Sequence, residues 1–276
     1  MARGGLKNIC RLIQEANEQI PIEQSFLSDL KRSIELSDKE NSRKPSETYK
    51  PSSMHCIRNM YYQRIGATQD DGETAYTLIG ICNSGSDIHQ RIQQATLDMA
   101  HHGMDCEYID VSQFVLQRHI DNVEIVQYPS FALKQYETKL FHRDLNMSFL
   151  CDGIIRYKGK YYILELKTEG VNKWMARKGV DPKHYMQATA YSIAFGLNDV
   201  IFVYINRDML DMKAFLFTPT DEMKAELVGK ISNCDTYVKN GQTPPKPNDL
   251  PRSVCEYCNY KTLCRLEQTI ETEDKA

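Results

Sequence analysis

Residues 148–168, SFLCDGIIRYKGKYYILELKT, determine the fold that this sequence predicts. Both halves of the stretch are rich in Ile, Leu, Phe and Tyr, and Lys158-Gly159 lies between them. Glycine readily adopts the positive φ that a tight turn between two strands requires. The stretch therefore predicts a β-hairpin with strands at residues 148–157 and 161–168, in which Tyr157 lies directly opposite Lys160.

The same register places two carboxylates, Asp152 and Glu165, directly opposite each other, with Cβ atoms roughly 4.5–5.5 Å apart. Two acids that face each other in an apolar hairpin repel, and a divalent cation such as Mg²⁺ or Mn²⁺ removes the repulsion because it binds hard oxygen ligands. Lys167 shares a strand face with Glu165, since side chains alternate along a strand. Its amine would orient or activate a water, or stabilise charge on a phosphate. The alternative interpretation is a surface hairpin with an ordinary Glu–Lys pair.

Three residues outside the hairpin strengthen the hypothesis of a catalytic site. Gln187 and Tyr191 are four residues apart, and therefore lie on one face of the predicted helix 183–195. Both side chains can contact a phosphate or hold Lys167. His89 lies in another predicted helix, where an imidazole ligand would shift the metal preference toward Mn²⁺. A single helical histidine is, however, more often a packed or exposed residue than a ligand.

Both helical and β-compatible segments are predicted along the rest of the chain. The predicted helices are residues 1–35, 54–65 (with Ser52 and Ser53 as cap candidates), 76–101, 183–195 and 220–240. Further β-compatible segments lie within residues 123–128, 131–141, 200–205 and 213–218. We expect three regions. Residues 1–53 form an N-terminal helical segment that ends in a polar linker at 36–53, and residues 54–240 form a core with a helical insertion. Residues 241–276 contain a Pro-rich loop, a cysteine cluster and a frayed acidic tail.

Three of the nine cysteines are clustered as Cys255-x₂-Cys258-x₅-Cys264. The two-residue spacing lets two thiolates reach one metal from a tight turn, and the site needs a fourth ligand. Cys56, at the start of a predicted helix far upstream, is our candidate. Four thiolates hold either Zn²⁺ or a 4Fe–4S cluster, and spacing alone does not decide between them. The cysteines without a partner pattern are expected to be core or surface thiols, and they are Cys10, Cys82, Cys106, Cys151 and Cys234.

Composition limits the partners and the location of the protein. The formal net charge is −3, which argues against a uniformly basic surface for nucleic acid. Residues 156–183 nevertheless carry eight Lys or Arg against three acids, and are either a solvated surface or a contact for a DNA backbone. No run of about 18 apolar residues occurs, so we expect no membrane span. The N-terminus lacks the apolar stretch of a signal peptide, so we expect a cytoplasmic protein, where clustered cysteines favour metal binding over disulfides.

An upstream cysteine, the histidine, the two acids, the lysine, the Gln187–Tyr191 pair and the C-terminal cysteine cluster follow one another along the chain in a characteristic order. In this order they resemble the RecB-like branch of the PD-(D/E)XK nuclease superfamily, and in particular the iron–sulfur exonucleases of CRISPR adaptation modules and phages. The resemblance implies a restriction-endonuclease-like core, which is a mixed central sheet flanked by helices, with a Cys-ligated C-terminal segment. One departure is Cys151, where the superfamily motif has proline. The implied roles are metal binding by His89, Asp152, Glu165 and the Leu166 carbonyl, catalysis by Lys167, a QxxxY motif at Gln187 and Tyr191, and a 4Fe–4S cluster at Cys56, Cys255, Cys258 and Cys264.

The expected activity is hydrolysis of DNA by a metal-activated water, as an exonuclease on single-stranded or frayed ends in phage or CRISPR-linked recombination, replication or repair. The sequence contains no G-x₄-GK[ST] stretch, so a helicase or recombination partner would be a separate chain. A homo-oligomer is known in such families, but nothing in the sequence requires one. The rival interpretations are a binding module with a vestigial site, and a nuclease with zinc in place of iron.

Overall fold

The computed structural model describes residues 21–40, 47–70, 75–248, 250, 252–256 and 258–273, with the backbone alone at 252, 253 and 269–273. The predictions for residues 1–20, for linker residues 41–46 and for the last three residues lie outside this part of the chain, as does Cys10. The chain forms two compact units, residues 1–43 with 72–83 and residues 44–71 with 84–276. All of the predicted site residues belong to the second unit.

The described part of the first unit consists of helix α2 (Ile22–Glu40) and the first turns of helix α4 (Tyr76–His101). Two contacts join these helices. The amide of Tyr76 donates to Glu35 Oε1 at 3.2 Å, and Lys31 Nζ lies 4.8 Å from the centre of the Tyr76 ring.

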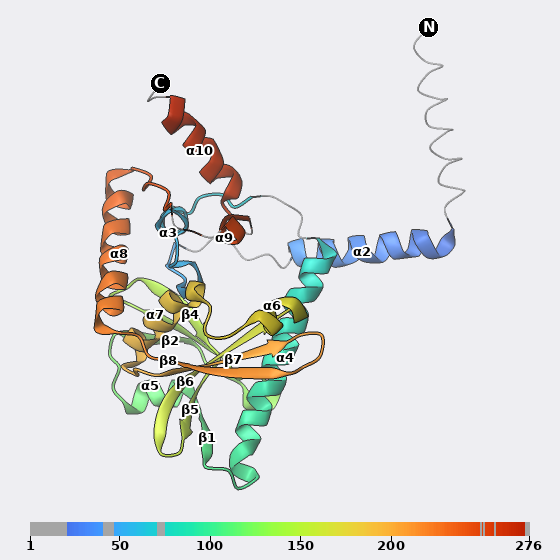
Figure 1. Ribbon diagram of the computed structural model, residues 1–276, viewed down its shortest axis with the longest axis vertical. Coiled ribbons are helices and arrows are strands. Elements are labelled where there is room, and N and C mark those ends of the chain that lie inside the picture. The colour runs from blue at the N-terminus through green and yellow to red at the C-terminus, as the bar shows by residue number, and fades with distance from the viewer. Residues whose placement is uncertain are drawn as a thin grey trace. The chain divides into compact units, whose positions relative to one another are not determined.

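A five-stranded mixed sheet forms the centre of the second unit (Figure 1). Its strands, in spatial order, are β1 (Cys106–Ile109), β5 (Gly153–Tyr157), β6 (Lys160–Glu169), β7 (Val200–Asn206) and β8 (Met212–Phe217). Strands β6 and β7 are parallel, and the other pairs are antiparallel. A second, antiparallel sheet has the order β2 (Val123–Gln127), β3 (Thr138–His142) and β4 (Met147–Cys151).

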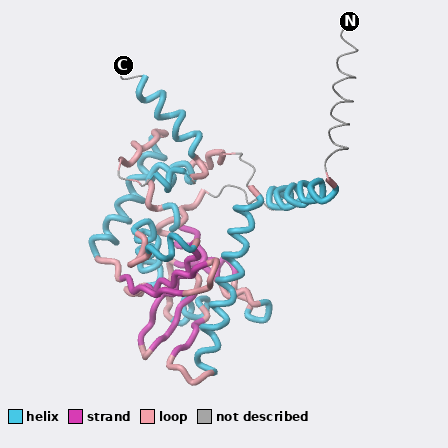
Figure 2. Tube along the Cα trace, turned by 45° about the vertical axis from the view of Figure 1, so that its right-hand side comes forward, coloured by secondary structure: helices cyan, strands magenta, loops and turns pink. Residues whose placement is uncertain are grey.

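Helices pack on both faces of the five-stranded sheet and create two cores. Figure 2 shows cyan helices surrounding the magenta strands. Leu164 and Leu166 of β6 pack in one core with Ile88 of α4, whereas Ile163 packs in the other core with residues of α7 (Tyr185–Phe195). This separation follows from the alternation of side chains along β6. The predicted α/β fold, a mixed central sheet flanked by helices, is therefore confirmed.

The other helical segments surround this framework. They are η1 (Pro51–Ser53), α3 (Ile57–Arg64), α5 (Val111–Gln117), η2 (Phe131–Leu133), α6 (Val171–Ala176), η3 (Pro182–His184), α8 (Asp221–Asn240), α9 (Arg252–Glu256) and α10 (Lys261–Glu273). Segment η1 packs against α7, and α8 packs against both α3 and α7. No described helix has the length and apolar character that crossing a membrane requires.

The predicted hairpin turn and its register are confirmed. Lys158 and Gly159 have φ values of 49° and 79°, as a two-residue turn with two positive φ angles requires. Tyr157 pairs with Lys160, and the ladder continues to the pair Gly153–Leu164.

The prediction of one continuous strand at residues 148–157 is wrong. The chain leaves β4 at Cys151 and enters β5 at Gly153, so the two halves belong to different sheets. Asp152 lies in the break and is not part of the ladder, so the prediction that Asp152 and Glu165 pair directly across the hairpin is wrong. Gly153 is required here because a Cβ atom would lie 2.7 Å from Cε2 of Tyr108.

Four other boundaries also differ from the predictions. The predicted linker overlaps α2, which continues to Glu40, and the predicted frayed tail is helical as far as Glu273. The helix predicted for 54–65 begins at Ile57, and its N-cap is Cys56 and not a serine. Residues 182–184 form a 3₁₀ turn before α7. Helix ends depend on tertiary contacts that local sequence does not specify.

We expect Gly153→Ala to destabilise the protein by about 1–3 kcal/mol, because the Tyr108 ring must shift to admit the new methyl group. Urea unfolding monitored by circular dichroism measures the change. Gly179→Ala is the matched control, since its Cβ would meet no atom within 4 Å. Equal loss of stability in both variants would contradict the close contact between Gly153 and Tyr108.

Candidate metal and catalytic site

Asp152, in the break between β4 and β5, is held through both its backbone carbonyl and its side chain. Its backbone carbonyl accepts hydrogen bonds from Gln93 Nε2 and from the hydroxyl of Tyr108, each at 2.7 Å. Its carboxylate accepts from the amide of Leu166 at 2.7 Å, and its other oxygen lies 3.4 Å from His89 Nδ1. The carboxylate is therefore fixed between helix α4 and strand β6.

Burial alone would raise the pKa of Asp152, but the contacts with His89, the charge of Lys167 and the Leu166 amide outweigh it and hold the pKa below its usual value. Asp152 is thus an anion near neutral pH, although its side chain is only 11% exposed.

Glu165 lies deeper in the sheet, with 2% of its surface exposed. Its Oε1 atom accepts from Lys167 Nζ at 2.5 Å and from Gln187 Nε2 at 2.7 Å. Its Oε2 atom is buried and has no hydrogen-bond partner among the described residues. Burial raises the pKa of Glu165 to about 7, and the charge of Asp152 acts in the same direction while that of Lys167 opposes it.

Lys167 connects the acid pair to helix α7. Its amine donates to Glu165 and to Gln187 Oε1 at 3.1 Å. Burial lowers the pKa of Lys167, but Glu165 and Asp152 outweigh it, so the pKa is raised and the amine stays protonated. The side chain keeps 22% of its surface exposed, which leaves it accessible to a substrate.

The two α7 residues contact the site in different ways. Gln187 bridges Lys167 and Glu165, as a residue that holds the lysine would. Tyr191 instead receives a hydrogen bond from Gln187 at 3.0 Å and donates to the carbonyl of Leu150 at 2.9 Å. Tyr191 is buried, with 4% of its surface exposed. It contacts Lys167 only indirectly, because its hydrogen-bond partner Gln187 is the residue that accepts from the lysine.

Sequence reasoning missed one acid of the site. The ligand atoms of His89, Glu137 and Asp152 all lie within 4.8 Å of one another, and this is the only such group of three His, Cys, Asp or Glu among the described residues. Glu137 precedes β3 and belongs to no motif, so only the fold reveals its position. The carboxylate of Glu165 lies outside this group of three, and the ligand set of His89, Asp152, Glu165 and the Leu166 carbonyl stays a prediction.

The chemistry of these residues fits a divalent cation. Two carboxylates and one imidazole converge here, and they are ligands that suit Mg²⁺ or Mn²⁺. The buried oxygen of Glu165 without a partner is costly unless a cation or a proton satisfies it. The mutual repulsion of Asp152 and Glu165, visible in the raised pKa of Glu165, points to the same requirement.

The four predicted cysteine ligands line one cavity. Cys56 precedes α3, and Cys255, Cys258 and Cys264 come from the C-terminal segment. Asn59 Nδ2 lies 3.5 Å from the sulfur of Cys258, and a guanidinium nitrogen of Arg58 lies 3.7 Å from that of Cys264. The described cysteines are all free thiols; among those without a predicted role, Cys82 is exposed and Cys106, Cys151 and Cys234 are buried.

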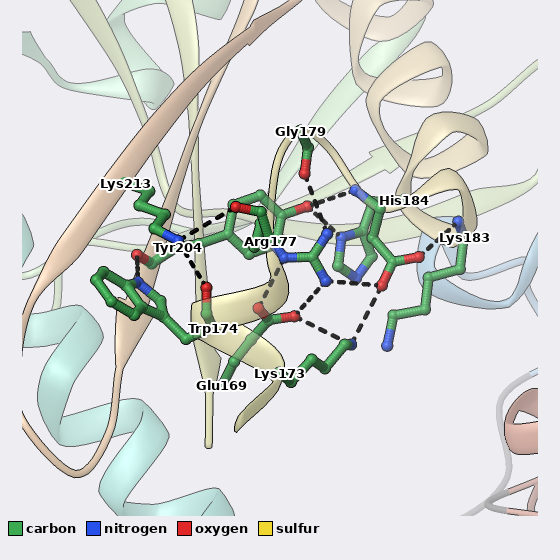
Figure 3. Close-up of polar contacts among 10 residues, drawn as sticks. Glu169, Lys173, Trp174, Arg177, Gly179, Lys183, His184, Tyr204 and Lys213 are labelled. Atoms are coloured by element: carbon green, nitrogen blue, oxygen red, sulfur yellow. Dashed lines mark hydrogen bonds and ion pairs between the residues drawn. The ribbon is translucent and has the colours of Figure 1, made fainter. Parts of the chain in front are cut away.

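A dense ion-pair network continues from the site along the α6–η3 segment (Figure 3). Glu169, two residues after Lys167, accepts from Nε of Arg177 at 2.7 Å and from a second guanidinium nitrogen at 2.7 Å. Lys173 contacts both Glu169 at 3.0 Å and Asp181 at 3.1 Å. Sequence reasoning identified the excess of basic residues in this segment but not the network.

The network changes the interpretation of the basic segment 156–183. Five of its eight cations form ion pairs with acids of the chain: Arg156 with Glu107, Lys160 with Asp199, Lys167 with Glu165, and Lys173 and Arg177 with Glu169. The segment therefore offers a DNA backbone fewer uncompensated charges than its sequence predicts.

Comparisons with known proteins give structural similarity alone. No protein-family model and no curated protein matches the chain. A solved structure titled SSO0001 is 16% identical, with a TM-score of 0.42 over 86% of this chain and 96% of that one. The alkaline exonuclease LHK-Exo from Laribacter hongkongensis is 11% identical, with a TM-score of 0.40 over 71% of this chain and 90% of that one. The structure of LHK-Exo in complex with dAMP is 10% identical, with a TM-score of 0.38. Chains this distant can share an arrangement of elements without sharing an activity.

We expect the protein without added divalent metal to lose stability as the pH rises from 4.5 to about 7. The folded state binds the Glu165 proton more tightly than the unfolded state does, so stability is highest below the unfolded pKa and falls through this window, by at most about 3 kcal/mol. Urea unfolding at several pH values measures the slope. Glu165→Gln should show a shallower slope, and an unchanged slope would contradict the raised pKa.

Proposed function

We propose that the chain is a metal-dependent DNA nuclease, and more specifically an exonuclease that acts on single-stranded or frayed DNA ends. One observation carries the proposal, namely the convergence of Asp152, Glu165 and Lys167 at a buried break in the sheet, with a carboxylate oxygen that lacks a partner. Two buried acids that repel each other are costly in a purely structural role, whereas a metal-dependent hydrolase needs them.

His89, Glu137 and Asp152 would hold the divalent ion, with Glu165 close by as the further ligand that the sequence predicts. The ion, when bound, supplies an activated water and neutralises charge on the phosphodiester. Lys167 is a protonated amine at the edge of the site, where it stabilises negative charge on the phosphate oxygens during hydrolysis. Gln187 holds the amine of Lys167 and the carboxylate of Glu165 in a fixed relative position.

The proposed occupant of the cysteine site is a 4Fe–4S cluster, with a single zinc ion as the alternative. The four cysteines line one cavity, and four thiolates suit either group. The amide of Asn59 and the guanidinium of Arg58 would donate to two of the thiolates and stabilise their charge.

The proposed setting is phage or CRISPR-linked recombination, replication or repair, in the cytoplasm of a cell. The alternative is a DNA- or partner-binding module with a vestigial site. The contacts among Lys167, Glu165 and Gln187 favour catalysis, because a vestigial site has no reason to retain a lysine held between a buried carboxylate and the amide of Gln187.

We expect Lys167→Ala to lower the rate of single-stranded DNA cleavage in Mn²⁺ by at least about 100-fold, since it removes the cation beside the phosphate. Cleavage of a labelled oligonucleotide under single-turnover conditions measures the rate. Lys239→Ala, on the exposed end of α8, is the matched control and should cleave like the wild type. Equal rates in both variants, or no cleavage by the wild type, would reject the nuclease proposal.

We expect Cys258→Ser to lower both the iron content and the melting temperature, because the cysteine site joins α3 to the C-terminal helices. Metal analysis and visible absorbance of anaerobically purified protein measure the first, and thermal unfolding measures the second. Cys82→Ser, at an exposed position, is the control. A colourless wild-type protein with one zinc ion would refute the iron–sulfur cluster, and an unchanged melting temperature would refute a structural role.

A further inference from the structure

His184 lies beside the catalytic lysine, although no motif includes it. In the parallel ladder of β6 and β7, Lys167 pairs with Tyr204, and the preceding residue on the same face of β7 is Phe202. The imidazole of His184 stacks on both rings, with centroid distances of 6.0 Å to Phe202 and 5.9 Å to Tyr204. The ring therefore covers the strand next to Lys167, on the face that carries Glu165.

The hydrogen bonds of Tyr204 determine which nitrogen of His184 carries the proton. The Tyr204 hydroxyl is fully buried, accepts from the amide of Asp181 at 3.0 Å, and lies 2.8 Å from His184 Nδ1 (Figure 3). A buried hydroxyl hydrogen needs an acceptor, and Nδ1 is the acceptor that the described residues offer it. Nδ1 therefore accepts, and the proton of the neutral ring is on Nε2.

The ring is also kept neutral. Burial lowers the pKa of His184 to about 2, and the neighbouring charges of Lys167 and Lys183 act in the same direction. A neutral imidazole with Nδ1 occupied has one donor left, which is the Nε2–H group. This group has no partner among the described residues, and it is not sealed from solvent.

The surrounding network holds this donor in place. Arg177 lies 4.3 Å from the centre of the Tyr204 ring and is itself anchored by Glu169 and Asp181. Asp181 fixes the Tyr204 hydroxyl through its amide. A donor that is immobilised before substrate binds loses little entropy on binding, which is the property that a positioning group needs.

We propose that His184 Nε2–H binds a phosphate oxygen of the DNA strand next to Lys167, as a neutral donor beside a charged one. This inference rests on the proposed nuclease function and adds a binding residue to that site. The ligand is the phosphodiester group, because an uncharged donor next to an ammonium suits an anion that presents several oxygens.

His184→Phe tests the proposal, because it keeps the aromatic stack and removes the donor. We expect it to weaken binding of a fluorescein-labelled single-stranded oligonucleotide, measured without divalent metal, by roughly 10- to 100-fold, the value of one hydrogen bond to a charged group. His184→Gln, which retains a side-chain N–H, should stay within about threefold of the wild type. His101→Phe, at an exposed position of α4, is the matched control. Equal affinities of His184→Phe and wild type would overturn the proposal.

Nitrogen-15 NMR of labelled histidines provides a readout that is independent of activity. We expect the His184 signal to report a proton on Nε2 in the wild type and a mixture of tautomers in Tyr204→Phe. A proton on Nδ1 in the wild type would overturn the proposal.

The two proposals can fail separately. If wild-type protein cleaves DNA, Lys167→Ala does not, and His184→Phe binds and cleaves normally, then the nuclease function stands and the role of His184 falls. If wild-type protein does not cleave, the nuclease proposal falls. The role of His184 is then upheld by weaker oligonucleotide binding in His184→Phe, and rejected by unchanged binding.

Discussion

The site depends on the burial of two carboxylates that repel each other. Asp152 and Glu165 are 8% and 2% exposed, and the repulsion between them contributes to the raised pKa of Glu165. Lys167 compensates for part of this cost through Oε1 of Glu165, but Oε2 is left without a partner in the described part of the chain. An arrangement of this kind weakens the fold when the site is empty, and becomes favourable when a cation or substrate charge enters it.

The fold creates this arrangement by interrupting a strand. A continuous strand at residues 148–157 would have placed Asp152 in a ladder, with its carbonyl bonded to a neighbouring strand. The break instead gives the carbonyl to Gln93 and Tyr108, and turns the carboxylate toward the Leu166 amide and His89. Two helices on opposite faces of the sheet then supply the remaining parts, because α4 carries His89 and α7 carries Gln187.

The sequence was sufficient for the local features and insufficient for those that depend on distant segments. The register of the hairpin followed from one turn, because Lys158-Gly159 allows a single way to pair the flanking strands. The break at Asp152 was missed because its cause, the ring of Tyr108 above Gly153, comes from a strand more than 40 residues upstream. Glu137 and the His184–Tyr204 pair were missed for the same reason: neither has a motif, and only the tertiary fold brings each of them to the site. The positive charge that the basic segment offers was overestimated, since its ion pairs with Glu107 and Asp199 involve acids outside the segment and cannot be read from local charge.

The cavity lined by the four cysteines and the acidic site around Asp152 and Glu165 are connected by a short series of contacts. Cys56 lies three residues after the end of η1, and η1 packs against α7, whose Gln187 holds both Lys167 and Glu165. Helix α3, whose N-cap is Cys56, packs against α8, which also contacts α7. Because packed helices transmit displacements with little compression, a group that fixes Cys56 to the C-terminal segment also restrains the helix that positions the lysine. A cofactor without a part in the chemistry would therefore still matter for the site, by restricting how far α7 can move from the sheet.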